Sequence, residues 1–244
     1  MSLLEVKNLY KHFDGVNAID HLSLSIQKGK INGIIGPNGS GKSTLVNLLT
    51  GMIPFDSGVV VVSETTRLSK IHAYEVLDFK VTRTFQDVRL FEQMPVLDNV
   101  LVVLTERNVA SALFERHNAF HLEKAEEVLK KVGLWEKKGE LAKNLSYGQR
   151  KLLEIARILA IDCDVFFFDE PFAGLFQEMI KVVVSVMKEL KEKDKTIILI
   201  EHNMDLIREL SDYLYVMDGG KLLAEGKPKE VLARKDVIEA YLGE

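Results

Sequence analysis

The sequence predicts a mixed α/β domain built on a parallel core sheet, and three observations predict it. First, short apolar runs at residues 31–35, 165–168 and 196–200 alternate with stretches of helical periodicity. Strands that alternate with helices are typical of parallel βαβ units. Second, a glycine-rich loop follows the run at residues 31–35. Third, two acidic residues follow the run at residues 165–168. Ligands of such sheets bind where the strands end, so both features indicate a site at that edge.

The N-terminal part of the chain predicts strands, a loop and one helix. Residues 3–10 and 22–26 alternate between apolar and polar side chains, which is the pattern of half-buried strands. Residues 31–35 form a short apolar run and suit a strand that is buried on both faces. A helix is expected over residues 43–50, with Gly51 at its C-terminal end. The β-branched residues 59–62 predict another strand.

The middle of the chain has a different pattern. From about residue 95 to residue 160 no strand run occurs, and helices are expected over residues 122–132 and 149–160. Strand patterns return at residues 165–168, 196–200 and 213–217, and a helix is expected over residues 180–193. We therefore predict an α/β core of residues 1–90 and 160–244, with residues 91–159 inserted as a helical subdomain.

The composition fits one folded domain of 244 residues, which is 47% hydrophobic and 28% charged. A net charge of −4 argues against a nucleic-acid partner, because such proteins usually need a basic face. No run reaches the roughly 20 apolar residues that cross a bilayer. The chain also opens without the basic and apolar segments of a secretory signal. The single cysteine, Cys163, is interpreted as a small buried hydrophobe.

A loop at residues 36–43 fits the phosphate-binding pattern G-x-x-x-x-G-K-[ST] at every fixed position. Its glycines let backbone N–H groups turn toward an anion, and the following helix points its N-terminal dipole at the same anion. Lys42 is expected to reach the outer phosphates of a nucleotide, and the Ser43 hydroxyl to bind Mg²⁺. The predicted nucleotide-binding residues here are Gly36, Pro37, Asn38, Gly39, Ser40, Gly41, Lys42, Ser43 and Thr44.

Polar residues that suit phosphate chemistry follow two of the other predicted strands. Asp169 comes directly after the apolar run 165–168, where a carboxylate at the sheet edge can hold Mg²⁺. Glu170 is then placed to orient or deprotonate the attacking water. His202 follows the run 196–200, and parallel strands end on one edge of a sheet. We therefore expect His202 to face the same nucleotide and to sense its γ-phosphate.

Five motifs, in this order along the chain, resemble those of the ATP-binding-cassette (ABC) ATPases. Besides the phosphate loop, they are Gln86 of the Q-loop, the signature motif, Asp169 and Glu170 of the Walker B motif, and the switch histidine His202. The signature residues are Leu145, Ser146, Tyr147, Gly148 and Gln149. The resemblance extends over essentially the whole chain. It implies a P-loop NTPase fold with a mixed RecA-like core sheet, an N-terminal antiparallel β subdomain and an inserted α-helical subdomain.

The resemblance also implies a mechanism. In the family, two ATP molecules with Mg²⁺ lie in a head-to-tail dimer, each between the phosphate loop of one subunit and the signature of the other. ATP binding closes the dimer and hydrolysis reopens it. Glu170, His202 and Gln86 would then be catalytic. The metal contacts would come from Ser43, Gln86 and Asp169.

An aromatic ring that stacks on adenine is another feature of the family. Phe13 stands at that position, and the nearby Tyr10 is compatible with the same role.

Within the family, the chain looks most like the ATPases of branched-chain amino-acid, amide or urea importers. The residues that carry this likeness are Tyr147 and the segments 83–86, 89–91, 200–204 and 240–244. The likeness implies a transport ATPase on the cytoplasmic face of the cell membrane. Its partners would be a second ATPase subunit, separate permease subunits that dock near Arg89, Leu90 and Phe91, and an extracytoplasmic substrate-binding protein.

Two alternatives stay open at this point. A soluble ABC ATPase of the iron–sulfur assembly type is compatible with the size of the chain. A weakly hydrolysing partner cassette is suggested by Phe176 and Gln177, which replace a polar residue and a proline of the family pattern.

Overall fold

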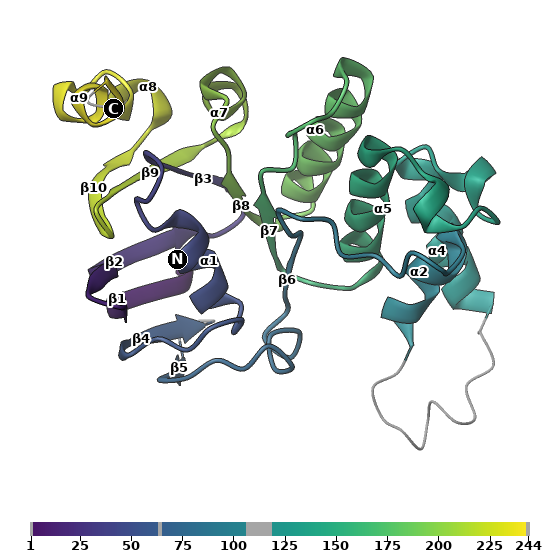
Figure 1. Ribbon diagram of the computed structural model, residues 1–244, viewed down its shortest axis with the longest axis horizontal. Coiled ribbons are helices and arrows are strands. Elements are labelled where there is room, and N and C mark those ends of the chain that lie inside the picture. Colours follow the sequence, from purple (N-terminus) through teal and green to yellow (C-terminus); the bar gives the residue numbers. More distant parts are fainter. Residues whose placement is uncertain (1, 63–64, 106–118, 243–244) are drawn as a thin grey trace. The chain divides into compact units, whose positions relative to one another are not determined.

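Two β-sheets and the helices around them form the first of two units in the computed structural model (Figure 1). The structure describes residues 2–62, 65–105 and 119–242. The first unit comprises residues 1–83, 163–170 and 187–244, and the second comprises residues 84–162 and 171–186. Among the helices described, none combines the length and the apolar character that a membrane crossing requires.

The smaller sheet of the first unit is antiparallel, with the strand order β2-β1-β4-β5. Its strands are β1 (Ser2–Phe13), β2 (Val16–Gln27), β4 (Ser57–Val62) and β5 (Thr66–Leu68). Asp14 and Gly15 join β1 to β2 with φ angles of 42° and 89°. This left-handed pair is what a two-residue hairpin turn of type I′ requires, and Asp-Gly is a favoured sequence for it.

The larger sheet is the core sheet, with the strand order β10-β9-β3-β8-β7-β6. Its strands are β3 (Ile31–Ile35), β6 (Val81–Arg83), β7 (Val165–Asp169), β8 (Thr196–Ile200), β9 (Tyr213–Asp218) and β10 (Lys221–Gly226). All neighbouring strands run parallel except β9 and β10. Strands β3, β7 and β8 are buried along their whole length, as their apolar runs predict. The sequence patterns did not reveal the short strand β6 or the edge strand β10.

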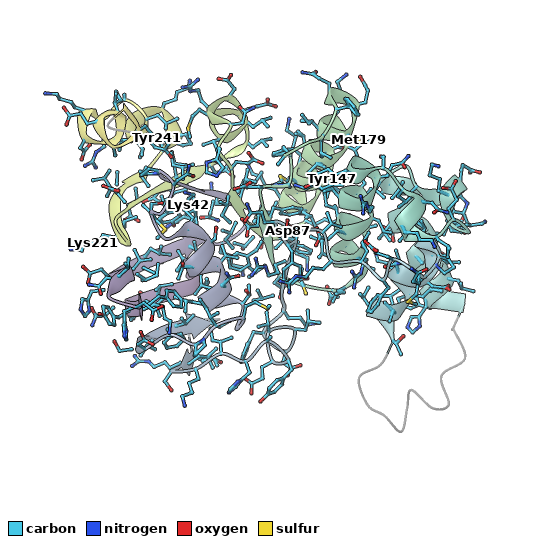
Figure 2. The ribbon with its side chains drawn as sticks, in the orientation of Figure 1. Lys42, Asp87, Tyr147, Met179, Lys221 and Tyr241 are labelled. Carbon is cyan, nitrogen blue, oxygen red and sulfur yellow. The ribbon has the colours of Figure 1, made fainter. Side chains whose placement is uncertain are left out.

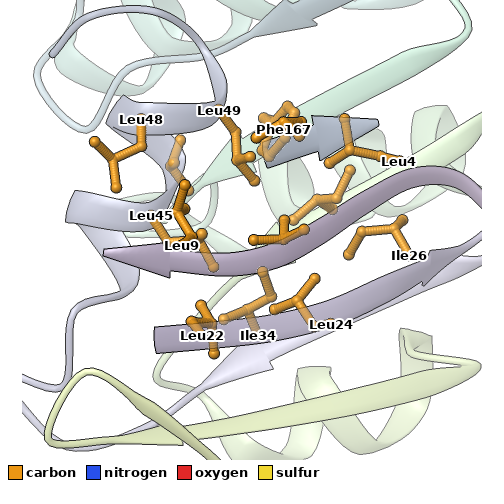
Figure 3. Packing of buried hydrophobic residues seen from close by; sticks show 14 of the residues in the cluster. Leu4, Leu9, Leu22, Leu24, Ile26, Ile34, Leu45, Leu48, Leu49 and Phe167 are labelled. Carbon is orange, nitrogen blue, oxygen red and sulfur yellow. The ribbon is translucent and has the colours of Figure 1, made fainter. Parts of the chain in front are cut away.

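Helix α1 (Lys42–Leu49) shares one buried cluster with both sheets. Its Leu45 and Leu48 lie with Leu9 of β1, Ile34 of β3 and Phe167 of β7 (Figure 3). The other helices of this unit are α7 (Met204–Leu210), α8 (Pro228–Val231), α9 (Lys235–Leu242) and the C-terminal end of α6 (Gln177–Glu192). Since α1 packs against both sheets, this packing fixes the position of the loop that precedes α1.

The second unit has helices as its main regular structure. They are α2 (Val96–Leu104), α4 (Ala119–Lys131), α5 (Tyr147–Ala160) and the N-terminal part of α6, with 3-10 turns at Trp135–Lys137 and Ala142–Asn144. Helix α5 packs against α2 and α4 with a buried face that includes Leu152, Leu153 and Ile155 (Figure 1). The helical prediction for residues 95–160 also covers residues 106–118, which lie outside the described residues.

The predicted fold class is confirmed, because an antiparallel sheet, a mixed core sheet and a helical unit are all present. We retain as a proposal the division into a core of residues 1–90 and 160–244 and a helical subdomain of residues 91–159.

Candidate functional site

The phosphate-binding loop lies between β3 and α1 in the first unit. A Cβ atom on Gly36 would lie 2.1 Å from the carbonyl oxygen of Met217, and one on Gly41 would lie 2.4 Å from that of Ala18. The φ angles of Gly36, Gly39 and Gly41 are 156°, 78° and 98°. Both the close backbone contacts and the left-handed dihedrals require glycine. The backbone geometry of the loop therefore requires these glycines, whether or not a ligand is bound.

Lys42 begins α1 and turns its ammonium group into this loop (Figure 2). Its Nζ donates to the carbonyl oxygens of Gly36 at 2.7 Å and Pro37 at 2.9 Å, and it lies 3.3 Å from Oγ of Ser40. Asn38 is exposed at the tip of the loop, whereas Lys42 and Ser40 are buried. Ser43 and Thr44 follow in the first turn of α1. The first unit therefore presents a cation and a helix N-terminus together, which suits a polyphosphate.

Asp169 is the last residue of β7 and is only 3% exposed. Arg83, at the end of β6, places Nη2 3.2 Å from Oδ2 of Asp169. Its Nη1 donates to Oδ1 of Asn47 at 2.8 Å and Oγ1 of Thr50 at 2.9 Å. One guanidinium group thus fixes the aspartate and ties two core strands to the region of α1. Sequence reasoning gave Arg83 no role, because its partners are distant in the chain.

Glu170 and His202 meet at the carboxyl edge of the core sheet. Nε2 of His202 lies 2.9 Å from Oε1 of Glu170. The strands that precede these two residues, β7 and β8, are parallel neighbours, with Asp169 paired to Ile200. Glu170 has a left-handed φ of 47°, and its N–H donates to the carbonyl of Ile200 at 3.0 Å. The geometry brings together two residues that the sequence placed at one edge.

The signature residues lie in the second unit, at the start of α5. Oγ of Ser146 accepts from the N–H of Gln149 at 3.3 Å, and Oε1 of Gln149 accepts from the N–H of Ser146 at 3.1 Å. This reciprocal capping box satisfies two donors at the helix end. A Cβ atom on Gly148 would lie 2.5 Å from Sδ of Met179. Leu145 is buried, whereas Ser146 and Tyr147 are exposed. Tyr147 and Met179 are labelled in Figure 2.

Gln86 lies in the second unit, exposed in a segment without helix or strand. Glu154, on α5, is a buried carboxylate that sequence reasoning missed. Burial raises the pKa of Glu154 from 4.5 to about 7, although the backbone N–H groups of Phe85 and Arg89 and the charge of Arg157 act the other way. The sequence did contain a signal for this residue, since Glu154 is a charged residue among the apolar residues on one face of α5.

The two aromatic residues proposed for adenine stacking differ in exposure. Phe13 is 43% exposed, with Nζ of Lys11 5.0 Å above its ring. Tyr10 stacks on His12 and His21, and its hydroxyl donates to Asn17 at 2.9 Å. Because the Tyr10 ring already has stacking partners, the geometry favours Phe13.

Comparison with known proteins decides the family. A model described as ABC transporter matches residues 19–173, which is more than half of the chain. The chain belongs to the ABC transporter family. A second model, described as branched-chain amino acid ATP-binding cassette transporter, matches residues 221–244.

Similar proteins extend over the whole length of this cassette. The high-affinity branched-chain amino acid transport ATP-binding protein LivG of Salmonella typhimurium is 37% identical over 99% of the chain and 98% of its own length. The probable LivG of Archaeoglobus fulgidus is 33% identical over 100% of the chain and 96% of its own length. A nucleotide-free ATP-binding cassette from an ABC transporter has a TM-score of 0.87 and 35% identity, with both chains fully covered. An ADP-bound conformation of such a cassette has a TM-score of 0.86, also with 35% identity and full coverage.

The cassette is therefore a nucleotide-binding subunit of an ABC transporter, an ATPase coupled to transport. The predicted family and activity are confirmed. Neither alternative is favoured by these relatives, whether the soluble iron–sulfur assembly ATPase or the weakly hydrolysing partner cassette that Phe176 and Gln177 suggested.

Proposed function

We propose that this cassette powers the import of branched-chain amino acids through separate permease subunits. The proposed substrate class rests on one observation, which is similarity along the full length to relatives that are named for branched-chain amino acid transport. The match of residues 221–244 to a branched-chain amino acid model supports the same class. The cassette would work as a head-to-tail dimer on the cytoplasmic face of the membrane. An extracytoplasmic protein would deliver the amino acid to the permeases.

ATP with Mg²⁺ is the proposed nucleotide. The Ser43 hydroxyl, the Asp169 carboxylate and the Gln86 amide oxygen are hard oxygen donors of the kind that Mg²⁺ prefers. The phosphate loop follows β3 and Asp169 ends β7, so both lie at the carboxyl ends of parallel strands of one sheet, which supports a shared site there. The bound metal would neutralise charge that develops on the transferred phosphoryl group. Lys42 would exchange its bonds to the loop carbonyls for bonds to phosphate oxygens.

Glu170 is the proposed base for the attacking water. In the tautomer with hydrogen on Nε2, His202 donates to Oε1 of Glu170 and so fixes the orientation of the carboxylate. The same N–H would turn to the γ-phosphate once ATP is bound. His202 would then return to Glu170 when the phosphate leaves, which gives the site a way to register hydrolysis.

The signature is proposed to bind the nucleotide of the partner subunit. Ser146 presents its hydroxyl and the N-terminus of the 14-residue helix α5, an arrangement that favours an anion. The adenine ring is proposed to stack on Phe13. Each site would then need residues from two chains.

Transport by the reconstituted complex tests the substrate class. Proteoliposomes that hold the permeases and this cassette, with the extracytoplasmic binding protein on the opposite side, should take up labelled leucine only with ATP in the compartment that faces the cassette. Unlabelled isoleucine and valine should compete, whereas urea should not. ATP-driven uptake of urea without uptake of leucine would contradict the proposal.

A further inference from the structure

One buried carboxylate holds the segment that carries Gln86. Within the second unit, the N–H of Phe85 donates to Oε1 of Glu154 at 3.1 Å, and the N–H of Arg89 donates to the same carboxylate. Nη1 of Arg157 donates to the carbonyl of Arg89. Residues 85 and 89 are therefore fastened to α5 at one place, and Gln86 lies on the short loop between them.

Contacts between side chains close this loop further. The guanidinium carbon of Arg89 lies 4.2 Å from the centre of the Phe85 ring, so the two fastened residues also contact each other. The guanidinium carbon of Arg157 lies 5.4 Å from the centre of the Phe91 ring. Fixing both ends of a short loop lowers the number of backbone conformations open to the residues between them. Glu154 thus restricts the position of Gln86 without touching it.

The next part of the segment is held by other groups. The N–H of Val96 donates to the carbonyl of Glu140 at 2.9 Å, and that of Ala142 donates to the carbonyl of Met94 at 3.0 Å. The fully buried Asn99 accepts from the N–H of Phe91 at 2.9 Å. These contacts do not involve Glu154. They provide an internal reference for any experiment that changes it.

A carboxylate has a capacity here that a neutral side chain of the same shape lacks. An ionised Glu offers two acceptor oxygens, whereas Gln offers one acceptor and two donors. Burying the charge of Glu154 is costly, since the residue is only 5% exposed. The hydrogen bonds from two backbone N–H groups offset part of this cost. The same two bonds hold the loop against α5.

We propose that Glu154 is a positioning residue for ATP hydrolysis. It fastens residues 85–89 to α5, and α5 begins at the signature residue Tyr147. Gln86 and the signature would then move as one body within the second unit. This inference rests on the proposed roles of Gln86 and the signature motif in the ATPase cycle.

Amide hydrogen exchange of the full chain tests the fastening directly. At pH 8, where Glu154 is ionised, the amides of Phe85 and Arg89 should exchange about tenfold faster in Glu154→Gln than in the wild type, as expected for losing a hydrogen bond to a charged group. The amides of Val96 and Ala142 should keep their protection, which also reports that the unit is folded. In the control Glu126→Gln, a half-exposed site paired with Lys130, no amide in residues 85–91 should change.

A second variant separates charge from shape. Glu154→Asp keeps a buried ionised acceptor and should restore part of the protection at Phe85 and Arg89. Unchanged exchange in Glu154→Gln would overturn the proposal. So would equal loosening in the Gln and Asp variants, because the charge would then have no role.

Kinetics test the consequence for catalysis. Glu154→Gln should keep the Kd for ATP, since the phosphate loop belongs to the first unit, and should lower kcat about tenfold. If the amides of Phe85 and Arg89 exchange faster in Glu154→Gln but kcat is unchanged, the positioning role is overturned, whereas the fastening of the segment stands. A wild-type cassette that binds but does not hydrolyse ATP would instead overturn the proposed function, and the exchange results would tell the two failures apart.

Discussion

The buried carboxylate of Glu154 makes the stability of the cassette depend on pH. Its pKa rises from 4.5 to about 7 in the folded state, mainly because burial disfavours the charged form. One pKa unit corresponds to about 1.4 kcal/mol, so this rise corresponds to about 3 kcal/mol. Between pH 4.5 and 7 the folded chain holds a proton that the unfolded chain has lost. The stabilisation is therefore complete below pH 4.5 and is lost as the pH rises through 7.

The assay compares urea unfolding of the wild type and Glu154→Gln from pH 5 to pH 8. Subtracting one free energy of unfolding from the other removes the groups that titrate alike in both proteins. Relative to the variant, the wild type should lose about 2.5 kcal/mol over this range, because part of the change already occurs below pH 5. The control Glu126→Gln, 40% exposed at its side chain, should differ from the wild type by about 0.5 kcal/mol or less at every pH. A flat difference for Glu154→Gln would refute the reasoning.

Three further predictions concern the first unit. Arg83→Met removes the ion pair with the buried Asp169 and should lower the free energy of unfolding, measured with urea, by about 3 kcal/mol. Adding Asp169→Asn to the same chain should recover part of that free energy. A loss below about 0.5 kcal/mol in Arg83→Met would contradict the pairing. At Glu170, whose φ is 47°, Gly should be more stable than Ala by about 1 kcal/mol in thermal unfolding; the opposite order would exclude the left-handed backbone. Lys42→Ala should weaken ATP binding about tenfold or more, as titration calorimetry can measure, and an unchanged Kd would refute the assignment of the loop.

Much of the core sheet could be predicted because its central strands are apolar along their whole length. Strands β3, β7 and β8 are buried on both faces, so their sequences carry a strong local signal. The meeting of Glu170 and His202 followed from the same reasoning, since parallel strands end on one edge. Strand β6 has three residues, which is too short for any periodicity to show.

The contacts of Arg83 and Glu154 could not be predicted, because they join residues far apart in the chain. Arg83 lies 86 positions from Asp169, and Phe85 lies 69 positions from Glu154. No local pattern specifies such pairs, since they depend on how the elements pack. A charged residue within a buried helix face indicates that a partner exists, but it does not identify the partner.

Hydrolysis of ATP by the wild type and by Glu170→Gln tests the central claim most directly. If Glu170 is the base of a transport ATPase, the wild type should turn over Mg·ATP. The variant should bind ATP with the same affinity and lose on the order of 10²–10⁴ in kcat. Glu170→Gln should also accumulate as an ATP-dependent dimer on a sizing column. A variant that hydrolyses ATP at close to the wild-type rate would contradict the account.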